Sequence, residues 1–326
     1  MSDGSRAKLR FSTRVSAEAT GEELTFARQL GVECLYTWVG EEQTGLDYLR
    51  RLKERADRAG LTLYNVGNMR LGKCDQIHLA LPGRDARIAE LKVFIRNLGR
   101  VGIHVTTFTW EPTNVWSSRQ RGESRGASAR MVDMAELEQR PYTHGRAYSR
   151  EEIWDNFAYL MREIIPVAED AGVRLALHPN DPPVPELGGI PCLIHSWADY
   201  QRAFEIADSP ALGMEFCAGC WLEGGAAFGD VLAGIRELAL GDRILLVHFR
   251  NVTAPLPYFV ETFLDNGYMD MYQIMRALVE VGYPNTVTLD HSPKLGCGGE
   301  EASTAYAVGY MRALKERAEQ ELWGAR

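Results

Sequence analysis

Four residues with metal-binding side chains stand at the ends of short apolar runs in the second half of the chain. They are His178, Cys217, His248 and Asp290, which follow the runs Leu-Ala-Leu, Met-Glu-Phe, Leu-Leu-Val and Val-Thr-Leu. A lone histidine or cysteine at such a place is more often hydrogen-bonded or simply buried, but four in register favour one shared site. Two imidazoles, a thiolate and a carboxylate carry a formal charge of roughly −2, which a divalent cation would neutralise. The sequence therefore predicts one divalent metal ion.

The apolar runs belong to a longer alternation of short apolar segments with longer segments of helical periodicity. Strands are expected at 9–13, 34–37, 62–66, 105–108, 174–177, 213–216, 244–248 and 286–289, and helices at 22–30, 46–59, 85–100, 150–171, 197–207, 228–240, 271–281 and 301–320. Eight such βα units in about 300 residues are typical of a (β/α)₈ barrel, which places its chemistry at the carboxyl ends of its strands. An open doubly wound sheet usually needs a Gly-rich turn after its first strand, and none is present.

Glycines followed by apolar residues recur where the expected helices end. Gly31, Gly60, Gly102, Gly172 and Gly282 all occupy such places. A glycine there lets the backbone adopt the left-handed conformation that ends a helix and leads into the next strand. The repetition supports one barrel domain over residues 1–326.

One long irregular stretch, residues 111–149, follows the fourth expected strand. Loops of this length in a compact domain are usually functional or mobile. Because it follows a strand, we expect it to cover the mouth of the barrel.

Other polar residues near the strand ends are weaker candidates. Arg250 is two residues beyond His248 and would face the same side, where it could bind a substrate anion or equally form a surface ion pair. Glu261 and Asp270 flank the loop after the seventh strand, and we interpret Asp270 as a helix cap. His291 should point away from Asp290 unless the strand has already turned.

Composition restricts the possible partners. The 326 residues are 45% hydrophobic and 25% charged with a net charge of −8, so nucleic acid and anionic membranes are unexpected partners. The first six residues lack a leader-like apolar stretch, and we expect a cytoplasmic protein. The six cysteines are interpreted as reduced, and the Cys217-Ala218-Gly219-Cys220 spacing is a weak redox signal.

Six motifs in order resemble the mannonate dehydratase family of sugar-acid dehydratases, which belongs with the xylose-isomerase-like barrels. They are Asn156-Phe157-Ala158 with its continuation to Glu169, His178-Pro179-Asn180-Asp181-Pro182-Pro183, Cys217-Ala218-Gly219, His248-Phe249-Arg250-Asn251, Gly267-Tyr268-Met269-Asp270-Met271-Tyr272, and Asp290-His291 with Tyr306-Ala307-Val308-Gly309-Tyr310. The resemblance covers about residues 80 to 315.

The resemblance implies a hydro-lyase that converts D-mannonate or a related aldonate to a 2-keto-3-deoxy acid. It places the family's metal ligands on the four strand-end residues and its acid/base residues on His291 and Tyr306. The implied metal is Mn²⁺, although the donor types also suit Fe²⁺, Co²⁺ or Zn²⁺. We expect substrate contacts from Arg250, Asn180 and Glu261, and a homo-oligomer.

Departures from the family keep other functions open. The helical insertion before Asn156 is missing, Asn180 replaces an aspartate, and the first-half motifs differ. A metal-dependent sugar isomerase or epimerase on the same barrel is the main alternative. It usually needs two carboxylates on the metal, whereas these strand ends supply one. A metal-stabilised barrel without turnover is the third hypothesis.

Overall fold

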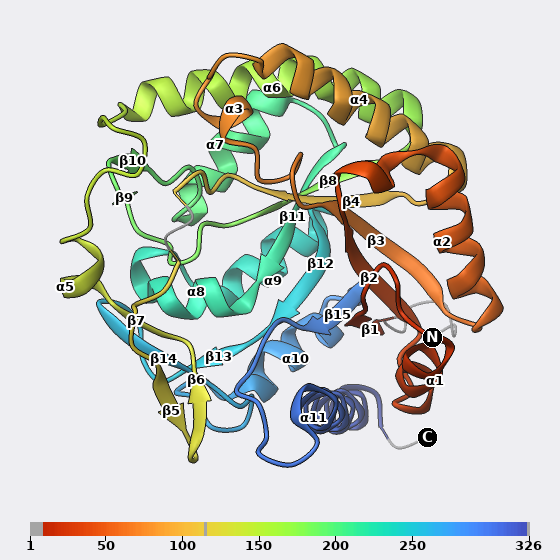
Figure 1. Cartoon of the computed structure of the whole chain (residues 1–326). Coiled ribbons are helices and arrows are strands. Elements are labelled where there is room, and N and C mark those ends of the chain that lie inside the picture. The colour runs from red at the N-terminus through yellow and green to blue at the C-terminus, as the bar shows by residue number, and fades with distance from the viewer. Residues whose placement is uncertain (1–8, 114–115, 325–326) are drawn as a thin grey trace.

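The computed structural model describes residues 9–113 and 116–324, and its centre is a closed barrel of eight parallel strands (Figure 1). The strands are β1 (Arg10–Arg14), β2 (Cys34–Val39), β3 (Thr62–Asn68), β4 (Val105–Thr109), β8 (Arg174–His178), β11 (Leu212–Cys217), β12 (Ile244–Phe249) and β15 (Thr286–Leu289). β1 pairs with both β2 and β15 and so closes the ring. Each of the eight expected strands overlaps one of these, which confirms the (β/α)₈ barrel.

Helices surround the barrel, as Figure 1 shows. The long ones are α1 (Gly21–Gln29), α2 (Leu46–Arg58), α4 (Arg84–Val101), α6 (Arg150–Ala171), α7 (Trp197–Ala207), α9 (Val231–Leu240), α10 (Met271–Glu280) and α11 (Gly299–Trp323). Shorter ones are η2 (Glu41–Thr44), α3 (Asp75–His78), α5 (Met134–Leu137), α8 (Ala218–Gly224) and η3 (Gly225–Ala227). The five predicted helix-ending glycines have φ between 62° and 76°, the left-handed conformation.

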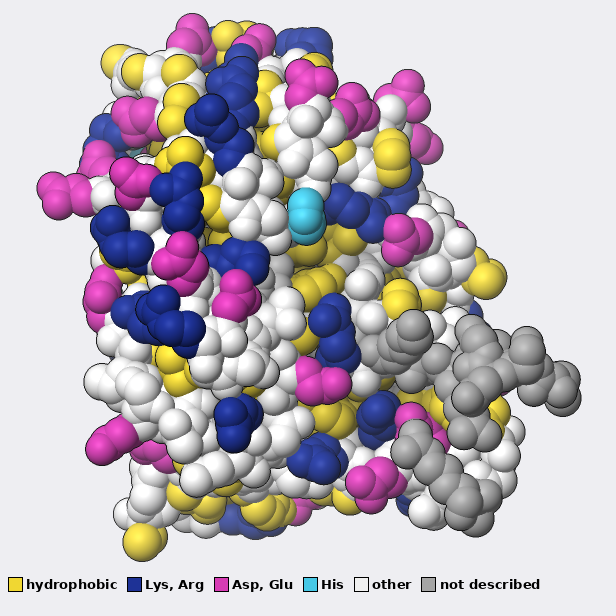
Figure 2. Space-filling model, turned by 90° about the vertical axis from the view of Figure 1, so that its right-hand side faces the viewer, with side chains coloured by type: hydrophobic (Ala, Val, Ile, Leu, Met, Phe, Trp, Pro, Cys, Tyr) yellow, Lys and Arg dark blue, Asp and Glu magenta, His cyan; other side chains and the backbone are white. Residues whose placement is uncertain are grey.

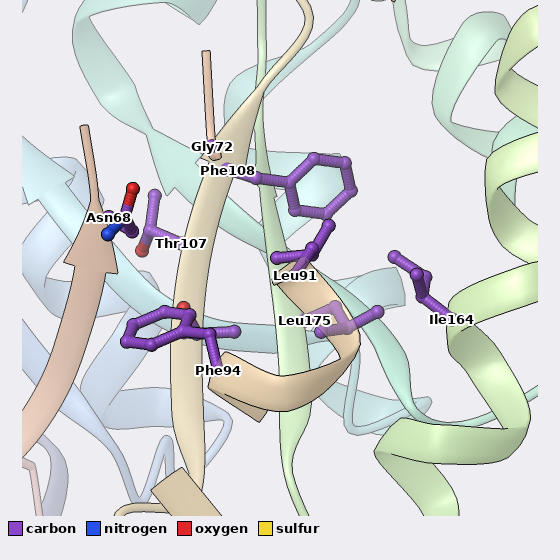
Figure 3. Close-up of a pocket in the computed structure, with 9 residues that line it drawn as sticks. Asn68, Gly72, Leu91, Phe94, Thr107, Phe108, Ile164 and Leu175 are labelled. Atoms are coloured by element: carbon purple, nitrogen blue, oxygen red, sulfur yellow. The ribbon is translucent and has the colours of Figure 1, made fainter. Parts of the chain in front are cut away.

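The hydrophobic core lies between the strands and the helices. Figure 3 shows Leu91 of α4, Ile164 of α6 and Phe108 of β4 packed around a cavity of only about 10 Å³. A space of this size holds at most one water molecule. The helices α4 and α6 therefore pack closely against the barrel strands at this point.

The segment 111–149 differs from the irregular loop that the sequence predicts. β5 (Gly122–Ser124) and β6 (Ala127–Ala129) form a hairpin, and β7 (Met131–Asp133) pairs with β14 (Tyr258–Thr262), which also pairs with β13 (Asn251–Val252). A second hairpin joins β9 (Glu186–Leu187) to β10 (Ile190–Pro191). Strands of two or three residues are too short to show a hydrophobic period. The pairing of β7 with β14 anchors this segment to the loops after β12.

Positive and negative side chains are interspersed on the face that carries α2, as Figure 2 shows. None of the helices in the described part of the chain combines the length and apolar character needed to cross a membrane. The first residues, on which the expectation of no leader peptide depends, lie outside the described residues.

Candidate active site

The ends of β8, β11, β12 and β15 bring the four predicted metal ligands together. One donor atom each of His178, Cys217 and His248 lies within 4.8 Å of the other two. Asp290 completes the group, because its Oδ1 is 3.3 Å from His248 Nδ1 and its Oδ2 is 3.7 Å from Cys217 Sγ. Cys217 is fully buried and His248 nearly so. Three of the four donors are thus mutually close at the carboxyl ends of the strands, and Asp290 contacts two of them.

The electrostatics of this group fit a divalent cation. Burial alone would raise the pKa of Cys217, yet neighbouring Cys220 and Arg250 hold it well below the ordinary value. Burial opposes protonation of His178 and His248, but the pKa of His178 rises to about 9 beside Cys217, and that of His248 rises well above its ordinary value beside Glu215 and Asp290. Neither ring nitrogen of His248 makes a well-directed hydrogen bond within the described structure. A metal ion would take the place of these protons.

Glu215 is a site residue that the sequence analysis missed. It precedes Cys217 by two residues in β11 and therefore faces the same side of the strand. Its Oε1 lies 2.5 Å from His248 Nε2, and among the described residues its buried Oε2 has no hydrogen-bond partner. A carboxylate on the second nitrogen of a ligating histidine commonly orients the ring. Its sequence did offer a sign of this role, because Glu215 is a charged residue inside an otherwise apolar strand. Such residues are rarely buried without a charged or metal partner.

Arg250 has a different environment from the one the sequence predicts. It is fully buried, its Nε donates to Asp290 Oδ2 at 2.8 Å, and its Nη1 donates to Glu261 at 2.8 Å. Nη1 also contacts Glu223, and Nη2 donates to Asp181 at 3.0 Å and contacts Cys217 Sγ at 3.5 Å. Each guanidinium nitrogen is thus already engaged by a protein group. This placement does not present Arg250 to a substrate carboxylate.

A buried charge cluster surrounds Arg250. It consists of Arg130, Asp181, Glu223, Arg250 and Glu261. Arg130, from the segment between β6 and β7, contacts the same three carboxylates from the other side, at 3.2 Å from Glu223 and 3.0 Å from Glu261. Through Arg250 the cluster contacts Asp290 and Cys217 of the metal-ligand group. Because Arg130 belongs to the 111–149 segment, the cluster connects this segment to the metal-ligand group.

The other predicted substrate contacts also bond to protein groups. Asn180 is buried, donates to the Trp110 carbonyl at 2.9 Å and accepts from the Ile194 amide at 2.9 Å, so it ties two loops together. Glu261 belongs to the buried charge cluster and its Oε2 lies 2.8 Å from His291 Nδ1. Asp270 caps α10 through the Tyr272 amide, as expected.

The two predicted acid/base residues lie in different places. His291 turns back toward Asp290, with 3.4 Å between Nε2 and Oδ2, because β15 has ended at Leu289. Burial would lower the pKa of His291, but Asp290 and Glu261 raise it. Tyr306 is 40% exposed, its hydroxyl donates to Asp265 at 2.6 Å, and it lines a separate pocket with Arg125. The structure does not bring Tyr306 to the metal-ligand group.

A pocket of about 480 Å³ opens above the metal-ligand group, and we call it the mouth pocket. Its floor includes His178, Glu215, His248, Asp290 and His291, and its walls include Arg14, Tyr36, Trp38, Met69, Lys73 and Trp116. This volume is in the range of small-molecule sites. Aromatic walls with a few charged groups suit a polar ligand the size of a sugar.

Comparison with solved structures places the fold among the sugar-converting barrels. The mannonate dehydratase from Streptococcus suis serotype 2 superposes with a TM-score of 0.83 at 25% identity, covering 97% of this chain and 95% of that one. An L-ribulose 3-epimerase superposes with a TM-score of 0.64 at 18% identity, covering 98% of this chain and 99% of that one, which shows the fold alone. Fold and donor set together define a TIM-barrel enzyme with a strand-end site for metal-ligating groups.

Sequence relatives define the family. The D-mannonate dehydratase (UxuA) family model matches residues 126–324. The mannonate dehydratase of Enterococcus faecalis is 28% identical over 82% of both chains, and that of Lactococcus lactis subsp. lactis is 29% identical over 85% of this chain and 86% of its own. The chain belongs to the D-mannonate dehydratase family and is a hydro-lyase, which confirms the resemblance drawn from its motifs.

Proposed function

We propose that this enzyme uses one divalent metal ion, held by His178, Cys217, His248 and Asp290, to remove water from D-mannonate or a closely related aldonate. The observation that carries the proposal is the convergence of these four donors in a chain of this family, with His178, His248 and Asp290 lining the mouth pocket and Cys217 buried beside them. We propose Mn²⁺ as the ion, with Fe²⁺, Co²⁺ and Zn²⁺ compatible with the donor types.

The chemistry begins at the weakly acidic C2 proton of the sugar acid. A bound divalent ion would stabilise the negative charge that develops on the carboxylate and C2 oxygens. Loss of water needs two proton transfers, removal of the C2 proton and protonation of the C3 hydroxyl that leaves as water. We assign one of these two transfers to His291, which lines the mouth pocket and is held at Nδ1 by Glu261. With Nδ1 engaged, Nε2 is the nitrogen that can exchange a proton with substrate. Asp290, one residue earlier, keeps this imidazole close to the metal-ligand group.

Metal content and reaction product test the proposal together. Protein purified without chelator should contain about one divalent ion per chain, and His178→Ala and Asp290→Ala should lose it because each removes a ligand. His104→Ala is the matched control, since His104 precedes β4 at the other end of the barrel and bonds to the Gly172 carbonyl. Full metal content in both ligand variants would contradict the site.

The product separates dehydratase from epimerase. Mn²⁺-loaded protein is incubated with a panel of hexonic and pentonic acids, and keto-acid formation is followed as the semicarbazone. A dehydratase product has lost one water, whereas an epimerase product keeps the mass of its substrate. Conversion without a change of mass would favour the isomerase or epimerase alternative.

A further inference from the structure

Arg14 ends β1 at the mouth of the barrel, level with Asp290. In the parallel pairing of β1 with β15, Ser12 stands opposite Thr288. Two residues further along each strand bring Arg14 and Asp290 to the same level. Ser12 and Thr288 are buried, and alternate side chains share a face, so Arg14 starts on the inner side of the barrel. It lines the mouth pocket beside Tyr36, its register partner in β2.

Arg14 differs from the other cations of the mouth pocket in having no carboxylate partner within the described structure. Lys73 Nζ lies 3.2 Å from Glu111 Oε2. The three imidazoles of the floor, His178, His248 and His291, all face acidic groups or the thiolate of the metal-ligand group. Arg14 is exposed, and its side chain makes neither a hydrogen bond nor an ion pair with any described residue. Among the described residues it is therefore the cation of the mouth pocket whose guanidinium is left for a ligand.

We propose that Arg14 binds the substrate carboxylate and makes the mouth pocket selective for sugar acids over neutral sugars. The inference rests on the proposed function and replaces Arg250, whose nitrogens are engaged by protein groups, as the carboxylate anchor. A guanidinium offers two parallel N–H donors that match the two oxygens of a carboxylate. Placed at the level of Asp290, this anchor would fix C1 next to the metal-ligand group and direct the hydroxylated carbons toward Tyr36 and Trp38.

Binding of an acid and its neutral counterpart tests this role. Mn²⁺-loaded wild type, Arg14→Gln and Arg14→Lys are titrated with D-mannonate and with mannitol, which lacks only the carboxylate, and quenching of Trp38 and Trp116 reports binding. Arg14→Gln should weaken D-mannonate binding about 10- to 100-fold, as loss of a charge-assisted pair does, and leave mannitol binding unchanged. Arg14→Lys should fall between, and KM should rise more than kcat falls.

The matched control is Arg70→Gln. Arg70 is a partly exposed arginine that also lies beyond a barrel strand, but it pairs with Glu41 and lines a different pocket. Metal content should be unchanged in all three variants. If wild type forms keto acid from D-mannonate and Arg14→Gln binds it with wild-type affinity, this inference is wrong and the proposed function stands. If wild type neither binds nor dehydrates any sugar acid, both are wrong.

Discussion

Replacing Glu215 by glutamine should weaken metal binding without changing the ligands themselves. Glu215 Oε1 is 2.5 Å from His248 Nε2 and the side chain is only 2% exposed, so the contact is shielded from solvent. With a metal ion on the other ring nitrogen, Nε2–H would donate to Glu215, and a hydrogen bond to a charged group contributes roughly 1.5–3 kcal/mol, about twice as much as a neutral one. Glutamine keeps the size and one acceptor oxygen, so Glu215→Gln should lose roughly 1–1.5 kcal/mol, or about tenfold in metal affinity. Glu215→Ala should lose up to about 100-fold.

The assay is competition for Mn²⁺ with a chromophoric chelator, supported by the visible spectrum of the Co²⁺ form, which reports ligand geometry. Asp199→Asn is the control, because Asp199 is also a buried carboxylate but pairs with Arg150 and accepts a hydrogen bond from Ser196 Oγ in the first turn of α7. Wild-type metal affinity in both Glu215 variants would refute an orienting role. Loss of turnover at unchanged metal affinity would instead make Glu215 a proton-transfer group.

Three further outcomes follow from the contacts of single residues. Arg250→Lys should lower the free energy of unfolding by roughly 3 kcal/mol and reduce metal content, because an ammonium cannot bond to all of the same buried carboxylates. If KM rises while the free energy of unfolding and the metal content stay unchanged, Arg250 is a substrate anchor after all. Tyr306→Phe should change kcat by less than about tenfold, because the Tyr306 hydroxyl bonds to Asp265 outside the mouth pocket. Loss of a positioned acid/base group typically lowers kcat by about 10²-fold or more. A decrease of that size in Tyr306→Phe would show that Tyr306 reaches the substrate. Burial, assisted by the charge of Lys73, lowers the pKa of His78 to about 3. The unfolded chain therefore binds a proton at this histidine below about pH 6.5, whereas the folded protein does so only near pH 3. The free energy of unfolding should accordingly fall as the pH is lowered from about 6.5 toward 3. In His78→Phe the stability difference between pH 7 and pH 5, measured by urea unfolding, should shrink by about 2 kcal/mol, and an unchanged difference would contradict a buried neutral imidazole.

The barrel and the metal-ligand group were predictable because both depend on local patterns. An apolar run of four or five residues predicts a strand from its own sequence alone. In a parallel barrel the carboxyl ends of all strands lie on one side. Placing His178, Cys217, His248 and Asp290 together therefore required no knowledge of which strands are neighbours. The helix-ending glycines were equally local, since each needs only its own positive φ.

The partners of Arg250 were not predictable in this way. Asp181 reaches it from the loop after β8, Glu223 from the short helix α8 and Glu261 from β14. Arg130 comes from a segment whose strands have only three residues. The spacing from His248 correctly placed Arg250 beside the site. Its offset alone could not show whether substrate or protein carboxylates would occupy the guanidinium.

The balance of buried charge explains how the charge cluster and the metal-ligand group depend on each other. Six acidic groups gather there, namely Asp181, Glu215, Cys217, Glu223, Glu261 and Asp290, against the two guanidinium groups of Arg130 and Arg250. Protons make up part of the difference, because burial raises the pKa of Glu223 well above its ordinary value, and the acidic neighbours raise the pKa of His178 to about 9 and that of His248 well above its ordinary value. A divalent ion supplies the same positive charge at one point and releases the imidazole protons as it binds. The surplus of acidic groups thus favours metal binding, and the ion pairs of the two arginines offset part of the cost of burying these groups.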